Sequence, residues 1–293
     1  MSYTLSGVIA AVVTPITRSF EPDVDRLITR MRYLLDHGCD GINLLGTTGE
    51  ATSFSAIQRE TVMRSIARAG LPMHRVMVGT GAANVRDAVS LSKVAEECGF
   101  AAALVLPPFY YKPLTTEGLL RYFAMITEAT ATRPLPIYLY NFPALSGITY
   151  TKEVVEALIH AFGDRIAGLK DSSGDLEYAS AIAALPAKLA VFPSNEATLI
   201  RARAGEFAGC ISATTNLNSQ LCAQAFHKGD KDALEKAVAV RDAFAGVPLV
   251  PAIKEETARR LQDPAFALPV PPLSALTSAE RLELQLRLKS LDG

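Results

Sequence analysis

Short apolar segments alternate with longer segments of helical periodicity along most of the chain. The apolar segments have the length of strands, and strands are predicted at residues 8–13, 41–45, 75–78, 101–106, 137–140, 166–170, 189–192 and 209–212. Between them, apolar residues return every three to four positions, as on a helix face that packs against a sheet. The chain therefore repeats a unit of one strand and one helix.

Capping residues mark the ends of several predicted helices. Apolar residues over 24–35 recur at helical spacing, and Gly38 ends that segment. Ser55 and Gln58 have the spacing of a capping box, which predicts that a helix begins there. A further helix is expected to begin near Thr115.

The order of the elements predicts the fold class. Parallel strands joined by helices of this length form right-handed crossovers, and repeated units of this kind predict an α/β (β/α)8 TIM barrel over residues 1–222. A doubly wound open sheet is the alternative. That fold usually carries a GxGxxG dinucleotide motif after its first strand, and here Thr14-Pro15 stands at that place.

The C-terminal part of the chain differs from the rest. Residues 223–293 lack the strand pattern and are expected to form a C-terminal helical region, broken around Pro248, Pro251 and the proline-rich stretch 264–272. We expect this region to pack outside the barrel or to build a subunit interface.

Composition excludes several classes of function. Of the 293 residues, 49% are hydrophobic and 20% charged, and the net charge of −1 leaves no cationic surface for a nucleic acid or an anionic membrane. No apolar stretch is long enough for a transmembrane helix. Residues 1–7 lack the basic region and the apolar core of a signal peptide.

Cysteine and histidine patterns give no sign of a metal site. The cysteines are scattered and contain no CxxC pair: Cys39, Cys98, Cys210 and Cys222. This pattern favours reduced thiols in a cytoplasmic protein. His37, His160 and His227 each precede a glycine closely, and we interpret them as residues at helix C-termini, where the helix dipole favours them.

Lys170 is the first candidate for catalysis. It closes the apolar strand that begins at Ile166, and the turn Asp171–Gly174 follows at once. Poor hydration at such a place disfavours the charged ammonium, and a neutral amine can attack a ketone to form a Schiff base. The simpler alternative is a lysine that ends a strand and points to water.

The ends of other predicted strands favour the catalytic interpretation. In a TIM barrel, the active site is assembled where the strands end. Gly46–Glu50 follows the second strand with two hydroxyls and backbone N–H groups that suit a carboxylate, and Tyr140–Pro143 follows the fifth. A Schiff-base lysine requires an anion-binding turn and a group that transfers protons.

Three motifs together resemble a known family. Gly46–Glu50, Tyr140–Pro143 and Gly168–Gly174 resemble, in order and spacing, the motifs of the dihydrodipicolinate synthase and N-acetylneuraminate lyase superfamily. The resemblance implies a barrel with added C-terminal helices and usually a homotetramer. It also implies chemistry through a Schiff base with pyruvate, without a metal or an organic cofactor.

The resemblance implies a role for each matching residue. Lys170 resembles the Schiff-base lysine, and Tyr140 resembles the tyrosine that acts as acid and base. Thr47 and Thr48 resemble the hydroxyl residues that bind the pyruvate carboxylate and relay protons. Tyr110 resembles the tyrosine that family members extend across a subunit interface to complete the relay.

Two further positions bear on the substrate. The main-chain carbonyl of Ile211 matches the one that usually faces the Schiff base. Synthases of this family carry an arginine two residues after the proline of the tyrosine motif, where it binds the carboxylate of aspartate semialdehyde. This chain has Leu145 there, and an apolar side chain forms no bidentate ion pair.

The segment after the seventh strand departs from the sialic-acid lyases. Those enzymes carry an adjacent acidic pair there, and this chain has Glu196 followed by Ala197. Ser194 also replaces a glycine that is common in the family. We expect a pocket lined by Ser194, Asn195, Glu196 and Ser212, which suits a short hydroxylated substrate better than a large amino sugar.

The preferred function is the cleavage of a 2-keto-3-deoxy sugar acid to pyruvate and an aldehyde, or the reverse. Within the same family, the alternatives are a dihydrodipicolinate synthase that condenses pyruvate with aspartate semialdehyde, and a sugar-acid dehydratase. A barrel that only binds a keto acid as a sensor is the non-enzymatic alternative. We expect a homo-oligomer, either dimer or tetramer. The length, stereochemistry and phosphorylation of the second substrate stay open.

Overall fold

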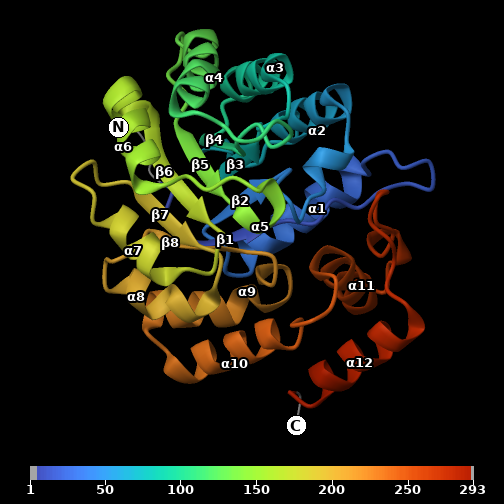
Figure 1. Cartoon of the computed structure of the whole chain (residues 1–293). Helices are drawn as coiled ribbons and strands as arrows, with labels where there is room; N and C mark the ends of the chain where they lie inside the picture. The colour runs from blue at the N-terminus through green and yellow to red at the C-terminus, as the bar shows by residue number, and fades with distance from the viewer. Residues whose placement is uncertain (1–4, 292–293) are drawn as a thin grey trace.

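A ring of parallel strands surrounded by helices forms the centre of the computed structural model, which describes residues 5–291 (Figure 1). The strands are β1 (Gly7–Ala11), β2 (Gly41–Leu44), β3 (Val76–Gly79), β4 (Ala102–Val105), β5 (Ile137–Asn141), β6 (Ile166–Asp171), β7 (Ala190–Pro193) and β8 (Gly209–Ser212). Each matches a strand predicted from the sequence. Residues 1–4 and 292–293 lie outside the described residues. The first four belong to the segment considered above for a signal peptide, and the last two belong to the predicted C-terminal region 223–293.

The strand order confirms the predicted TIM barrel. The strands lie in the order β7-β6-β5-β4-β3-β2-β1-β8, so each strand neighbours the next one along the chain, and β1 also pairs with β8. The Ala208 N–H donates to the Val191 carbonyl at 2.9 Å, which brings the start of β8 against β7 and draws the ring together.

One or two helices follow each strand and cover the outside of the barrel. They are α1 (Val24–Asp36), α2 (Ala56–Arg68), α3 (Val85–Glu97), α4 (Thr116–Ala129), α5 (Pro143–Ser146), α6 (Lys152–Phe162), α7 (Leu176–Ala183), α8 (Leu199–Arg203) and α9 (Thr215–Ala223). The predicted capping box of Ser55 and Gln58 begins α2, and Thr115 caps α4. His37 caps the end of α1, as expected.

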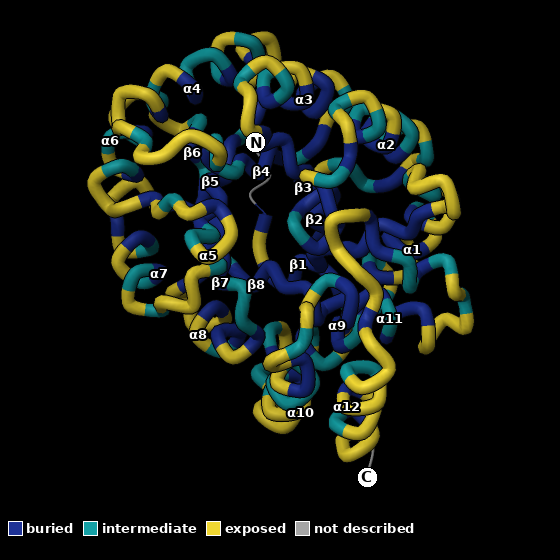
Figure 2. The backbone as a smooth tube through the Cα atoms, turned by 45° about the vertical axis from the view of Figure 1, so that its right-hand side comes forward, coloured by how far each residue is buried: buried dark blue, intermediate teal, exposed yellow. Residues whose placement is uncertain are grey.

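Two apolar layers result from the alternation of side chains along each strand. One set points into the barrel and includes Ile9, Met77, Tyr140, Phe192 and Ile211. The other set points outward and packs against the helices. Figure 2 shows the consequence, with the strands buried at the centre and most exposed backbone on the outer helices and their turns.

The C-terminal region adds three helices outside the barrel, α10 (Lys231–Asp242), α11 (Leu249–Leu261) and α12 (Ser278–Lys289). The expected break falls just before Pro248, which is the N-cap of α11. Pro251 lies within the first turn of α11, where a missing N–H costs little. The domain boundary between residues 222 and 223 stays a prediction. Within residues 5–291, no helix combines the length and apolar character of a membrane span.

Candidate active site

Three of the predicted site residues meet where the barrel strands end. β5 and β6 pair with Tyr140 opposite Lys170, and Lys170 Nζ lies 3.8 Å from the centroid of the Tyr140 ring. The Tyr140 hydroxyl and Thr47 Oγ1 form a hydrogen bond of 3.1 Å. Lys170 is only 5% exposed and Tyr140 2%. The face of an aromatic ring attracts a cation, so Tyr140 contacts both the amine and the hydroxyl of the neighbouring turn.

The turn after β2 has an unusual backbone. Leu45 and Glu50, at either end of it, have positive φ angles of 50° and 56°, which cost energy in residues with a side chain. Within the described part of the chain, the N–H groups of Thr47 and Thr48 have no hydrogen-bond acceptor. Adjacent free N–H groups of this kind form a concave site for an anion, so the turn can hold a carboxylate.

A buried ion pair holds this turn in place. Lys254 of α11 pairs with Glu50, and both side chains are 0% exposed. Lys254 Nζ also donates to the Thr14 carbonyl at 2.9 Å, and Glu50 Oε1 accepts from the Val270 N–H at 2.6 Å. Burial lowers the pKa of Lys254, and the charge of Glu50 opposes that effect. The C-terminal region is thereby fastened to the turn that carries Thr47 and Thr48.

Asn141 and Asp171 directly follow Tyr140 and Lys170 in the sequence. Their side chains point away from the barrel interior and are hydrogen-bonded to each other. Asn141 Nδ2 donates to Asp171 Oδ1 at 2.7 Å, and the Tyr150 N–H donates to Asn141 Oδ1 at 3.1 Å. Burial raises the pKa of the Asp171 carboxyl, although its hydrogen bonds oppose the shift. This pair locks the ends of β5 and β6 together and fixes the positions of Tyr140 and Lys170.

A small cavity of about 20 Å³ opens beside Thr47 and Tyr140. The buried guanidinium of Arg59, from α2, forms part of its wall and donates to the carbonyls of Gly79 and Gly81 at 2.8 Å and 3.2 Å. Arg59 therefore braces the turn after β3 against the cavity.

Sequence reasoning overlooked Lys254, Arg59 and the bond between Asn141 and Asp171. A signal existed for Lys254, which directly follows the apolar residues 249–253 at the start of its helix. A charged residue in such a place requires a buried partner.

Other predicted site residues lie at different depths. Ile211 is fully buried in the barrel interior, and Ser194 is half-buried at the end of β7, where its N–H donates to the Asp171 carbonyl at 2.9 Å. Leu145, on α5, is 64% exposed. Tyr110 is 75% exposed, and its ring packs edge-on against Tyr111 with centroids 5.3 Å apart. Both exposed residues are free to meet a substrate or another subunit.

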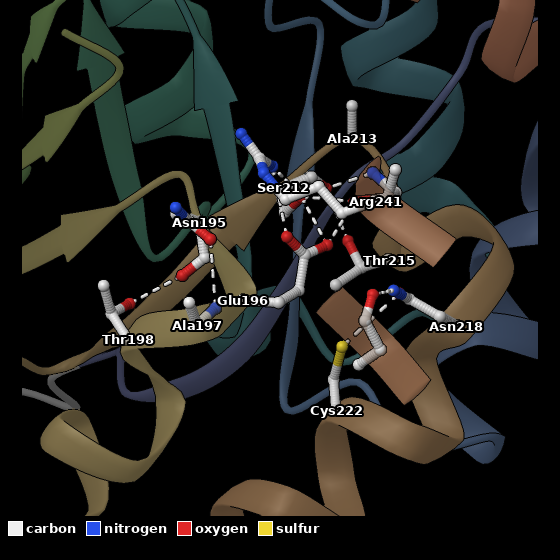
Figure 3. Close-up of polar contacts among 12 residues, drawn as sticks. Asn195, Glu196, Ala197, Thr198, Ser212, Ala213, Thr215, Asn218, Cys222 and Arg241 are labelled. Carbon is white, nitrogen blue, oxygen red and sulfur yellow. Dashed lines mark hydrogen bonds and ion pairs between the residues drawn. The ribbon is translucent and has the colours of Figure 1, made fainter. Parts of the chain in front are cut away.

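Glu196 and Ser212 are bonded to each other and to the C-terminal region, and their place in a substrate pocket stays a prediction. Glu196 is 0% exposed, accepts from Ser212 Oγ at 2.7 Å and from Thr214, and pairs with Arg241 of α10 at 3.1 Å. Figure 3 shows the Glu196 carboxylate directed toward Ser212 and Arg241. Both oxygens are already bonded because a buried carboxylate needs partners. Glu196 thus joins α10 to the barrel.

Comparison with known proteins gives the family. The model of the dihydrodipicolinate synthetase family matches residues 4–282. The chain belongs to this family. It is 34% identical over 280 residues to an uncharacterized DapA-like lyase of Chloroflexus aurantiacus, covering 92% of both chains. Members of the family are carbon–carbon lyases, and so is this protein.

Solved structures agree with this assignment. Dihydrodipicolinate synthase from Agrobacterium tumefaciens superposes with a TM-score of 0.90 at 27% identity, covering 97% of this chain and 99% of that one. YagE, a prophage protein of the dihydrodipicolinic acid synthase family from E. coli K12, was solved in complex with pyruvate. It superposes with a TM-score of 0.86 at 25% identity, covering 98% of both chains.

The ion pair between Glu50 and Lys254 yields a test. Lys254→Met leaves a buried carboxylate without its partner, so the free energy of unfolding should fall by about 3–5 kcal/mol. Adding Glu50→Gln removes the remaining charge and should restore much of the loss. Urea unfolding of both variants measures this, with the exposed Lys236→Met as control. A Lys254→Met protein as stable as the control would contradict the proposed role of the pair.

Proposed function

We propose that this lyase cleaves a 2-keto-3-deoxy sugar acid to pyruvate and an aldehyde, or catalyses the reverse, through a Schiff base on Lys170. The observation that carries the proposal is the convergence of Lys170, Tyr140 and Thr47: the amine lies 3.8 Å from the Tyr140 ring, and the Tyr140 hydroxyl bonds to Thr47 at 3.1 Å. A nucleophile, an acid–base group and an anion-binding turn are the parts that this chemistry requires.

In the proposed reaction, the Lys170 amine attacks the C2 ketone and water leaves, which gives a protonated imine. Tyr140 removes the proton of the C4 hydroxyl, with Thr47 as its relay. The bond between C3 and C4 then breaks, its electrons move into the imine to form an enamine, and the aldehyde departs. Protonation at C3 and hydrolysis release pyruvate and restore the amine.

The substrate is proposed to lie with its carboxylate against the N–H groups of Thr47 and Thr48 and with the Ile211 carbonyl facing the imine. Its hydroxylated end then extends toward Ser194, whose hydroxyl has no partner among residues 5–291. Glu196 and Ser212 support the side of the pocket that carries Ser194, from behind, through their bonds to Arg241. Leu145 adds an apolar contact at the rim.

A dihydrodipicolinate synthase is the second candidate, and the similarity to the Agrobacterium enzyme favours it. A sugar-acid dehydratase would use the same imine to expel water. A screen of 2-keto-3-deoxy sugar acids and sialic acid for pyruvate release and for substrate consumption, beside condensation of pyruvate with aspartate semialdehyde, separates the three, because a dehydratase consumes a sugar acid without releasing pyruvate. Pyruvate released with an aldehyde supports the aldolase, whereas release of neither product from any sugar acid overturns it.

We also propose a homo-oligomer in which Tyr110 reaches the neighbouring site. The support is a group of exposed apolar side chains: Tyr110 and Tyr111 on the loop after β4, and Leu145 on α5, which follows β5. A single subunit leaves these side chains in water, and clusters of this kind mark protein interfaces.

Lys170 should form a covalent imine with pyruvate. Borohydride reduction in the presence of pyruvate is expected to add one reduced pyruvate to the peptide that contains Lys170, as measured by mass spectrometry. Lys170→Arg should lose both the label and the activity, because a guanidinium forms no such imine. Label on another lysine would refute the assignment.

Tyr140→Phe should lower kcat by about 10²- to 10⁴-fold, the usual effect of losing a positioned acid or base. The ring still packs against Lys170, so the unfolding temperature is expected to change little. The matched Tyr138→Phe, also inside the barrel, should retain far more activity. A Tyr140→Phe enzyme with near-normal kcat would remove this tyrosine from proton transfer.

Activity should depend on assembly. Sedimentation is expected to give a dimer or tetramer at assay concentration. Tyr110→Phe should lower kcat because it removes a hydroxyl from the relay of the neighbouring site, whereas Tyr111→Phe serves as its control. A fully active monomer would contradict the proposal.

Leu145 should control the choice of substrate. Leu145→Arg is expected to improve condensation with aspartate semialdehyde and to weaken sugar-acid cleavage, since it adds a charge that matches a carboxylate. Because specificity is a ratio, kcat/KM must be measured for both substrates on both proteins. If the unmodified protein already prefers aspartate semialdehyde to every sugar acid, Leu145 is not the discriminator and the synthase is the correct assignment.

A further inference from the structure

We propose that a basic pocket on the outside of the barrel, between α1, α9 and α11, binds a phosphate group. The pocket has a volume of about 510 Å³ and is open to solvent. It shares no lining residue with the cavity beside Tyr140. The three helices lie together on one side of the barrel (Figure 2), and the residues that define the site are Arg30, Tyr33, Asn218, Thr257 and Arg260.

A buried positive charge without a counter-ion is the main observation. Arg30 is only 5% exposed, and within residues 5–291 no carboxylate lies within ion-pair distance of it. Its guanidinium donates to the Asn216 carbonyl and lies 5.0 Å from the centroid of the Tyr33 ring. Its Nε has no partner. A dipole and an aromatic face compensate a buried charge only in part.

A second guanidinium enters the same pocket. Arg260 donates to the Leu217 carbonyl at 2.9 Å and to Glu256 at 2.6 Å, but Glu256 also pairs with Arg259 at 2.7 Å. One carboxylate is therefore shared, and the pocket keeps an excess of positive charge. Burial lowers the pKa of Arg30, and the charge of Arg260 lowers it further, as expected for two like charges brought close together.

The shape of α9 brings the two arginines to one place. Asn218 has backbone angles of φ −126° and ψ 22°, which are not helical, so α9 bends there. The two residues before the bend, Asn216 and Leu217, offer the carbonyls that accept from Arg30 and Arg260. Each arginine keeps further N–H groups, because a guanidinium has five donors.

The donor set favours phosphate over a carboxylate. Thr257, 1% exposed, lines the pocket with a hydroxyl that has no partner, and it adds to the donors of the two guanidiniums. A phosphate carries more acceptor oxygens and more negative charge than a carboxylate, so it can bond to all three donor groups and balance both guanidiniums. Guanidinium groups also bind phosphate through two parallel hydrogen bonds.

The test measures thermal unfolding of the full chain at increasing inorganic phosphate, with ionic strength held constant by sodium chloride. A saturable rise in the unfolding temperature is expected, and acetate at the same concentrations should give a much weaker one. Arg30→Gln should weaken phosphate binding by about 10- to 100-fold, the usual loss for hydrogen bonds from a charged group. Arg86→Gln, an exposed arginine of α3, should bind as the unmodified protein does.

Thr257→Val provides a variant that keeps the charges. It should weaken phosphate binding by about 2- to 10-fold while the unliganded protein stays at least as stable, because the lost hydroxyl has no partner. If Arg30→Gln fails to fold, the phosphate affinity of Thr257→Val decides whether the pocket binds phosphate. The proposal is overturned by the absence of a saturable effect, by acetate binding as tightly as phosphate, or by phosphate affinity that Arg30→Gln and Thr257→Val both leave unchanged.

Discussion

The buried ion pair between Glu50 and Lys254 ties the two parts of this protein together. Glu50 ends the turn that carries Thr47 and Thr48, and Lys254 comes from a helix that follows the whole barrel in the sequence. Two buried charges without water persist only when each satisfies the other and further hydrogen bonds complete both groups. Thr14 and Val270 supply those bonds, so the turn that carries Thr47 and Thr48 depends on the C-terminal region for its shape.

Within the barrel, the register of β5 and β6 arranges the chemistry. Parallel pairing places Tyr140 beside Lys170 and Asn141 beside Asp171. Because successive side chains point to opposite faces of a strand, the first pair enters the barrel interior and the second faces the helices. The inner pair thus lies at the proposed site, and the outer pair joins the ends of β5 and β6 through a hydrogen bond.

Buried charged side chains serve different purposes according to what surrounds them. Glu196 is bonded to Ser212 and to an arginine of α10, so its charge is used to attach a helix. Arg30 is also buried, but no carboxylate among the described residues forms an ion pair with it, and it borders an open pocket. The difference lies in whether the fold supplies a counter-ion, and that difference underlies the proposed phosphate site.

Local patterns in the sequence were enough to predict the eight strands, the caps of α2 and α4 and the closed barrel, because strand length, capping residues and crossover handedness are properties of short segments. They also predicted Lys170, Tyr140 and Thr47 as candidate site residues, and the structure brings these three together because strand ends meet on one face of a barrel. The partners of Glu50, Glu196 and Arg30 could not be predicted from local sequence patterns. Each lies on an element distant in sequence, and only the packing of the helices on the barrel determines which charges meet, which are shared and which are left without a partner.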